Sequence, residues 1–247
     1  MKTIRNCVLV LLLIAVAQTA FGQTADEIIE KHLAAMGGRA ALEKVKSRTS
    51  TGTIRLTLPI GGEVTGTIET YNQVPNKTRI LIKIDLSALG VGQMVQDQRF
   101  DGTTAFVSDT LQGNREITGN QLENMKNNGF PTALLNYKEN GTIELQGKEK
   151  VGDRDAYVLV GKPKTGSAVR MYFDAQTYLP IKSVASVNVP QIGRDIETTT
   201  ETSDFRDVDG VKVPFQIKSS SELQSFTVNM TKVEQNTSID PAMFSKP

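Results

Sequence analysis

The sequence predicts an α+β protein built on one large curved antiparallel sheet, an incomplete barrel of about ten or eleven strands, with a helix at its N-terminus and helices inserted in mid-chain. Three observations support this prediction. Most of the chain alternates apolar and polar residues with a period of two. Turn residues rich in glycine separate these stretches. The connections are too short to hold the crossover helices that parallel strands require.

The N-terminal residues have the pattern of a secretory signal peptide. Lys2 and Arg5 precede a short apolar stretch at residues 8–16, and small residues follow at Ala20 and Gly22. The apolar stretch is too short to anchor the chain across a bilayer. We therefore predict a signal peptide over residues 1–22, cleavage after Gly22, and one domain over residues 23–247.

Composition excludes several kinds of chemistry from the mature chain. Cys7 is the only cysteine and lies in the predicted signal, so the remaining 247 − 22 = 225 residues have none. They cannot form a disulfide, a thiolate nucleophile or a cysteine-ligated zinc site. With 28 basic and 27 acidic residues, the chain has a net charge of +1 and no block of like charge. Nothing in this pattern indicates binding to nucleic acid or to an anionic membrane through charge.

The first predicted element after the signal is a helix. Thr24 and Glu27 have the spacing of a capping box. The apolar residues that follow at helical spacing are Ile28, Ile29, Leu33 and Met36, with His32 on the same stripe, and then Ala41, Leu42 and Val45. Gly37-Gly38 interrupts the stripe, which predicts a helix of about five turns that is bent or broken at the glycine pair.

The remaining elements are strands apart from one segment. Alternation or turn signals predict strands over residues 54–60, 64–68, 78–85, 94–100 and 103–107, and then over 142–147, 156–161, 168–173, 179–189, 198–205, 213–219 and 226–233. Residues 118–138 break this rhythm and predict two short amphipathic helices.

The acidic stretch at Asp204, Asp207 and Asp209 allows two interpretations, a metal site or a hairpin turn. Asp209-Gly210 lies between two alternating stretches and suits the tight turn of a hairpin. A calcium loop needs further oxygen ligands at alternate positions and usually a closing glutamate, but the next acidic residue is Glu222. We therefore predict a turn and no metal site.

No catalytic group is predicted either. His32 is the only histidine, and its place on an apolar stripe favours a structural role over that of a general base. Glycoside hydrolysis needs only two carboxylates, but the chain has no tryptophan and only 6% aromatic residues on which sugars could stack. The sequence has no phosphate-binding loop or dinucleotide fingerprint. We expect no cofactor.

The strands are apolar on one face, and either other parts of the chain or a ligand must cover that face. A curved sheet with helices over its opening can enclose a cavity for an apolar ligand, or the helices can fill the interior. Both interpretations stay open on these residues. Alternation gives the candidate cavity residues Ile54, Leu56, Leu58, Ile68, Ile80, Ile82, Ile84 and Met94. The candidate lid residues are Leu122, Met125, Leu134 and Leu135.

Several turn and strand patterns carry a resemblance to a known family. They are residues 71–77 (YNQVPNK), 99–107 (RFDGTTAFV), 171–174 (MYFD) with 179–181 (LPI), and 239–244 (IDPAMF). With the helix after the signal and the helices in mid-chain, this order resembles the LolA/LolB-like superfamily of periplasmic lipoprotein carriers, also described as outer-membrane lipoprotein-sorting proteins. The resemblance extends over nearly all of the mature chain.

The resemblance implies a fold and a function. The fold is an unclosed β-barrel with a helical lid over an apolar cavity that holds acyl chains. The function is that of a non-catalytic periplasmic carrier, with lipid or lipoprotein acyl chains and envelope donor or acceptor proteins as partners, acting as a monomer. An envelope regulatory or protein-interaction module on the same fold is the alternative.

One position departs from the family pattern. The carriers have an arginine directly before the Pro-Asn pair, and this arginine latches the lid through hydrogen bonds. Here that position is Val74. The lid must therefore close by other contacts, or the protein carries another cargo.

Overall fold

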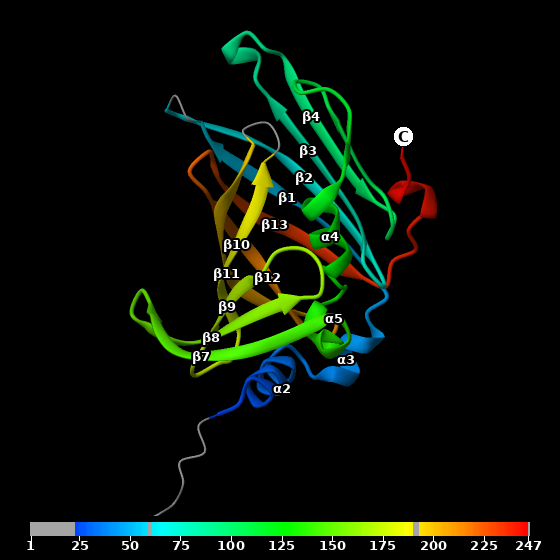
Figure 1. Cartoon of the computed structure of the whole chain (residues 1–247). Helices are drawn as coiled ribbons and strands as arrows, with labels where there is room; N and C mark the ends of the chain where they lie inside the picture. The colour runs from blue at the N-terminus through cyan, green and yellow to red at the C-terminus, as the bar shows by residue number, and fades with distance from the viewer. Residues whose placement is uncertain (1–22, 59–60, 190–192, 247) are drawn as a thin grey trace, which may run out of the picture.

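The computed structural model describes residues 23–58, 61–189 and 193–246. Within these residues, thirteen strands form one sheet (Figure 1). The strands are β1 (Ser47–Thr57), β2 (Glu63–Gln73), β3 (Lys77–Asp85), β4 (Gln93–Phe100), β5 (Ala105–Asp109), β6 (Arg115–Ile117), β7 (Gly141–Val151), β8 (Arg154–Pro163), β9 (Val169–Asp174), β10 (Pro180–Val189), β11 (Arg194–Val208), β12 (Val211–Ser220) and β13 (Ser225–Gln235).

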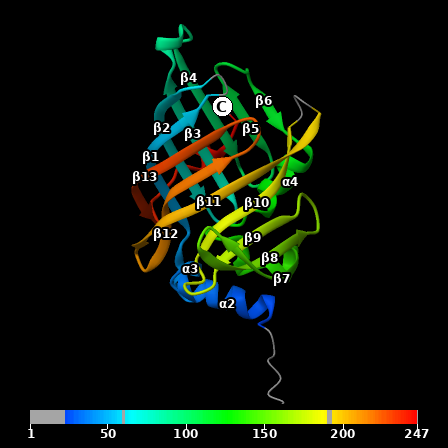
Figure 2. The same cartoon turned by 90° about the vertical axis from the view of Figure 1, so that its left-hand side faces the viewer.

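The sheet is antiparallel and is not closed into a barrel. Its order is β6-β5-β4-β3-β2-β1-β13-β12-β11-β10-β9-β8-β7, so β6 and β7 are its two edges. Strong twist curls it around a hollow, as Figures 1 and 2 show from two sides. The predicted curved, unclosed sheet is confirmed. The thirteen strands exceed the ten or eleven predicted. Each of the twelve stretches named from the sequence overlaps a strand, and the remaining strand, β6, has three residues and is too short to show alternation.

The Asp207–Gly210 end of the acidic stretch forms the turn between β11 and β12, whereas Asp204 lies within β11 and makes an ion pair with Arg206 at 2.6 Å. Asp209 and Gly210 both have positive φ, 51° and 79°, as a tight hairpin requires. The Oδ1 of Asp207 accepts a hydrogen bond from the backbone N–H of Gly210 at 3.0 Å. In the described part of the chain, no group of three or more His, Cys, Asp or Glu residues is placed to hold a metal ion.

Two helices form at the N-terminus where one bent or broken helix was expected, α2 (Ala25–Ala35) and α3 (Arg39–Lys44). The predicted capping box is present, with Glu27 N donating to Thr24 Oγ1 at 3.2 Å and Thr24 N to Glu27 Oε2 at 3.1 Å. Gly37 separates the helices with φ of 122°, and a Cβ there would lie 2.1 Å from the carbonyl oxygen of Gly210. The break therefore lets the chain pass directly against the β11–β12 turn.

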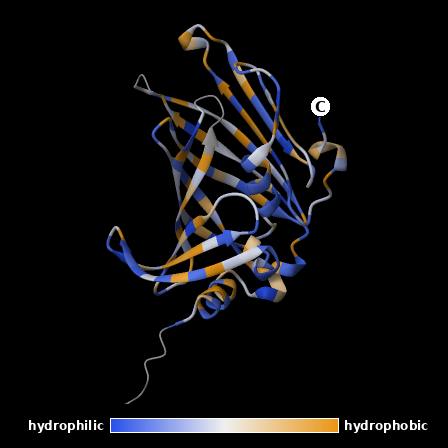
Figure 3. Ribbon diagram, viewed as in Figure 1, coloured by the Kyte–Doolittle hydropathy of each residue, from blue (hydrophilic) through white to orange (hydrophobic). Residues whose placement is uncertain are grey.

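The apolar core is divided among several clusters. The largest joins α2 and α3 to one half of the sheet through residues such as Ile29, Leu33, Leu159 and Phe173. A second cluster lies on the other half, on β1, β2, β3 and β13 and around Leu86, which follows β3. Figure 3 shows the alternation of apolar and polar residues along the strands that produces these faces.

The mid-chain segment forms α4 (Gly119–Asn127), the 3-10 turn η2 (Ala133–Leu135) and α5 (Tyr137–Asn140). These elements lie over the hollow of the sheet (Figure 1). Two further 3-10 turns are η1 (Ser87–Leu89) and η4 (Pro241–Phe244). None of the helices in the described residues has the length and apolar character that crossing a membrane would require.

Candidate functional site

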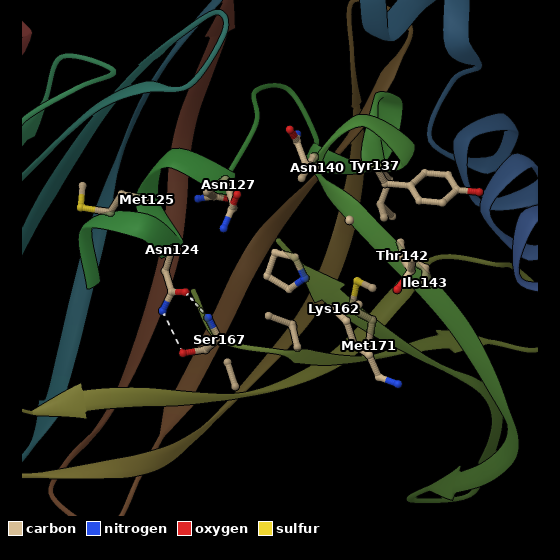
Figure 4. Close-up of a pocket in the computed structure, with 18 of the residues that line it drawn as sticks. Asn124, Met125, Asn127, Tyr137, Asn140, Thr142, Ile143, Lys162, Ser167 and Met171 are labelled. Carbon is tan, nitrogen blue, oxygen red and sulfur yellow. Dashed lines mark hydrogen bonds between the residues drawn. The ribbon is translucent and has the colours of Figure 1, made fainter. Parts of the chain in front are cut away.

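A cavity of about 460 Å³ lies between the mid-chain helices and the inner face of β7–β10. Its surface is mainly apolar. The sheet contributes the floor, through Ile143, Val169, Met171, Ala185 and Val187, and the mid-chain helices contribute the cover (Figure 4). This volume is in the range of small-molecule sites, which begins at about 300 Å³.

The strand register explains why these residues face one cavity. Ile143 pairs with Gly161, Gly161 with Val169, and Val169 with Ala185 across four neighbouring strands. Paired residues of antiparallel strands point to the same side of the sheet, so the row forms one continuous surface. Gly161 lies within this row and has no side chain, so only its backbone contributes to the cavity floor at that point.

The helix α4 is latched to the β8–β9 connection by side-chain amides. Asn124 Oδ1 accepts from Ser167 N at 2.7 Å, and Asn124 Nδ2 donates to Ser167 Oγ at 3.4 Å (Figure 4). Asn127 Nδ2 donates to the carbonyl oxygen of Thr165 at 2.6 Å. These bonds hold one side of the cover to the cavity rim.

The opposite side of the cover is held at the β2–β3 turn. Asn76 Nδ2 donates to the carbonyl oxygen of Lys126 at 3.0 Å, and Phe130 N donates to the carbonyl oxygen of Pro75 at 2.7 Å. Val74 N donates to Lys46 O at 3.0 Å, directly beyond the paired ends of β1 and β2. The Pro-Asn turn therefore holds the cover through its own carbonyl and amide groups, without an arginine at Val74.

A third attachment joins the cover to the N-terminal helices. Arg39 Nη1 donates to the carbonyl oxygen of Leu135 at 2.9 Å. Tyr137 and Lys138 of α5 both donate to the carboxylate of Asp26. The hydrogen bond from Lys138, and after it the one from Tyr137, lowers the pKa of Asp26 below its usual range. These attachments are polar, whereas Leu134 of η2 is buried in the main core. The helix α4, which has no buried residue, is therefore the part of the cover that can move without disrupting that core.

A second cavity of about 370 Å³ lies on the other side of α4, against the inner face of β1–β4, β12 and β13. Met125 and Asn128 border both cavities and form a common wall. The second cavity has a more polar surface than the first. The side chains around it include Arg48, Ser50, Thr70, Asn72 and Gln98.

The sequence-based cavity residues gather on one face of the sheet. Seven of the eight belong to the second apolar cluster, with Ile54, Ile68 and Ile84 buried and Leu56, Ile80, Ile82 and Met94 half-buried. Leu58 is half-buried beyond the end of β1. Ile80 borders the second cavity. That a ligand contacts this set stays a prediction.

The candidate lid residues are divided between two environments. Leu122 and Met125 pack against the cluster around Phe100 and Val107. Leu134 is buried in the core under α2, and Leu135 packs against it. Met125 and Leu134 border the first cavity.

The floor of the first cavity was not among the residues named from the sequence. Alternation along β10 places Ala185 and Val187 on one face, but no local pattern indicates that α4 lies over that face as well as over the face of β1–β4. This placement involves contacts between Asn124 and Ser167, which are 43 residues apart.

His32 is part of the core and lines neither cavity. Its ring packs against Phe173 with centroids 4.8 Å apart, and its Nδ1 lies 3.1 Å from the carbonyl oxygen of Tyr178. Desolvation lowers the pKa of His32 to about 4, so the ring is neutral at pH 7. Since a carbonyl oxygen only accepts hydrogen bonds, the proton of the neutral ring is on Nδ1.

Comparison with known proteins gives the fold. No family model matches the chain, and none of the curated proteins matches it. Among solved structures, a LolA superfamily protein from Nitrosomonas europaea superposes with a TM-score of 0.57 at 16% sequence identity, over 91% of this chain and 99% of that one. This chain has the LolA fold.

A second solved structure supports the same fold. A DUF1329 family protein from Desulfovibrio piger superposes with a TM-score of 0.58 at 16% identity, over 91% of this chain and 98% of that one. The LolA fold therefore extends over nearly all the described residues of this chain.

Proposed function

We propose that this protein binds acyl chains of lipids or lipoproteins in the cavity under α4 and shields them from water in the periplasm. It acts as a non-catalytic carrier of the outer-membrane lipoprotein-sorting type. The observation that carries this proposal is the apolar cavity between β7–β10 and a cover held by amide hydrogen bonds. The LolA fold and the N-terminus, which has the pattern of a secretory signal peptide, support the proposed location in the periplasm.

The energetics of burial suit a reversible carrier. Removing an acyl chain from water is favourable by about 0.8 kcal/mol per buried methylene. Each hydrogen bond that closes the cover contributes about 1 kcal/mol net. A chain of several methylenes can therefore be retained by a cover that still opens readily.

The test compares two variants on one strand. Ala185→Phe places a ring in the cavity floor, whereas Ser186→Phe places the same ring on the opposite face of β10. Ala185→Phe is expected to weaken the binding of a fluorescent fatty acid by about tenfold or more, and Ser186→Phe to leave it unchanged. The measurement is a titration of the purified protein, with competition by a diacyl lipid.

Saturable binding near one ligand per protein, reduced only by Ala185→Phe, is the expected result. Lipid extraction and mass spectrometry of the purified protein should also find bound lipid. A folded protein that binds neither the probe nor the diacyl lipid would exclude the carrier function.

A protein-interaction role is the second candidate because apolar side chains are exposed on the hairpin connections. Leu89 and Val91 follow β3, Leu111 follows β5 and Leu223 follows β12, and each side chain is 43–51% exposed. Co-purification of one envelope protein in a fixed ratio, lost when these residues are changed to serine and unaffected by lipid, would favour this role.

A further inference from the structure

A half-buried cation borders the second cavity. Arg48 is on β1, opposite Asn72 of β2 and Gln235 of β13, and its side chain borders the cavity. Its Cζ lies 5.3 Å from the centre of the Phe130 ring, which belongs to the segment after α4. The Nε of Arg48 is buried and has no hydrogen-bond partner. The guanidinium is thus only partly satisfied by the protein.

The groups around Arg48 suit an anion. No aspartate or glutamate is among the described residues that border this cavity, and Lys77 contributes a second cation. Hydroxyl and amide groups that can donate hydrogen bonds complete the polar wall, from Ser50, Thr70, Asn72, Thr78 and Gln98.

Partial burial makes a counterion for Arg48 energetically significant. Desolvation lowers the pKa of Arg48 to about 10, so the side chain still carries its charge at neutral pH. A buried charge without a counterion destabilises a protein, and a bound anion offsets that cost. Arginine is also suited to hold carboxylate or phosphate through two parallel hydrogen bonds.

The cavity also has an apolar side. Ile80, Ile217 and Met230 border it and pack against the apolar cluster on the same half of the sheet. Across the shared wall of Met125 and Asn128 lies the apolar first cavity. A polar, cationic space is therefore in direct contact with apolar surfaces that suit an acyl chain.

We propose that the ligand is an anionic amphiphile whose carboxylate or phosphate head binds Arg48 in the second cavity while its chain lies on the adjoining apolar surfaces. This inference rests on the proposed acyl-chain function and names the class of ligand. The hydroxyl and amide side chains around Arg48 complete the site for the head.

The test uses four probes and isothermal titration of the purified protein. The probes are dodecanoate, dodecyl phosphate, dodecanol and inorganic phosphate. The two anionic amphiphiles are expected to bind about 10- to 100-fold more tightly than dodecanol, as a charge-assisted hydrogen bond predicts. Inorganic phosphate alone is expected to show no binding at the concentrations that saturate the amphiphiles.

The variants isolate the charge. Arg48→Met should reduce the affinity for both anionic amphiphiles to that for dodecanol and leave dodecanol unchanged. Arg48→Lys should retain part of the preference. The control is Arg55→Met on the exposed face of the same strand, which should behave as the wild type. Circular dichroism checks that each variant is folded, which is expected because methionine replaces a buried charge.

The outcomes separate this inference from the proposed function. Equal binding of all three amphiphiles, or an anion preference that survives Arg48→Met, would overturn the role of Arg48 and leave acyl-chain binding intact. Tight binding of inorganic phosphate without binding of any amphiphile would show an anion site unrelated to lipid and overturn the inference. No binding of any probe would contradict both.

Discussion

At the scale of single residues, the histidine and aspartates that the sequence offers as candidate catalytic or metal-binding groups have structural roles. His32 packs on Phe173 and bonds to the Tyr178 carbonyl. Asp207 and Asp209 form a turn. Arg48, which has no motif around it, is instead a half-buried cation that borders a cavity, with its Nε buried and without a hydrogen-bond partner. Arg48 is distinguished as a candidate functional residue by its surroundings and by an Nε without a hydrogen-bond partner, and not by its residue type.

His32 should make stability depend on pH in weakly acidic solution. Its pKa in the folded protein is about 4, below the ordinary value of 6.5, so the unfolded chain binds the proton first as the pH falls. The free energy of unfolding should therefore decrease below about pH 6.5. Between pH 7.5 and 5 the loss from this residue is expected to be about 2 kcal/mol.

The measurement is urea unfolding of the wild type and of His32→Gln at both pH values. Carboxylates that are stabilised in their charged form, such as Asp174, affect both proteins, so the difference between the two isolates His32. Parallel decreases in stability would show that His32 is not buried in its neutral form.

At the scale of elements, the mid-chain helices form a cover that is attached at three places. Amides of α4 bond to the β8–β9 connection, the β2–β3 turn holds the segment from Lys126 to Phe130, and Arg39 holds η2. The helix α4 has no buried residue of its own. Its position therefore depends on these polar contacts together with the packing of the half-buried Leu122 and Met125 against the cluster around Phe100.

Removing the amide latch should loosen α4 without unfolding the sheet. Asn124→Ala with Asn127→Ala removes three hydrogen bonds to the β8–β9 connection. Amide hydrogen exchange in residues 119–128 should become about tenfold faster or more, while the strands keep their protection. Asn120→Ala, an exposed position on the same helix, is the control. Unchanged exchange in the double variant would show that other contacts position α4.

At the scale of the whole molecule, the sheet curls but its edges β6 and β7 stay apart, and the cover lies across the hollow between them. The cavities are bordered by strands from both halves, with α4 as the wall between them. Displacement of the cover would therefore open the interior while the sheet stays intact, which is the motion that the proposed acyl-chain carrier requires.

Locking the cover should block ligand exchange. Asn124→Cys with Ser167→Cys, in a Cys7→Ser background, joins α4 to the β8–β9 connection where the two side chains already bond. Oxidation should slow uptake and release of a fluorescent fatty acid by about tenfold or more. Reduction should restore the rates, and each single cysteine variant is a control. Unchanged rates in the oxidised protein would indicate entry by a route that bypasses α4.

Local sequence patterns were enough to predict the class of fold, the turn at Asp209-Gly210, the capping box at Thr24 and the apolar faces that include Ile54 and Ile82. These features depend on local backbone preferences and on the two-residue period of a strand, which a sequence displays directly. Three features depend on the tertiary structure: α4 lies between the two halves of the sheet, Ala185 and Val187 form a cavity floor, and Arg48 borders a cavity whose described lining residues include no carboxylate. Those features arise from contacts between residues far apart in the chain and from the curl of the whole sheet, neither of which is encoded in a local pattern.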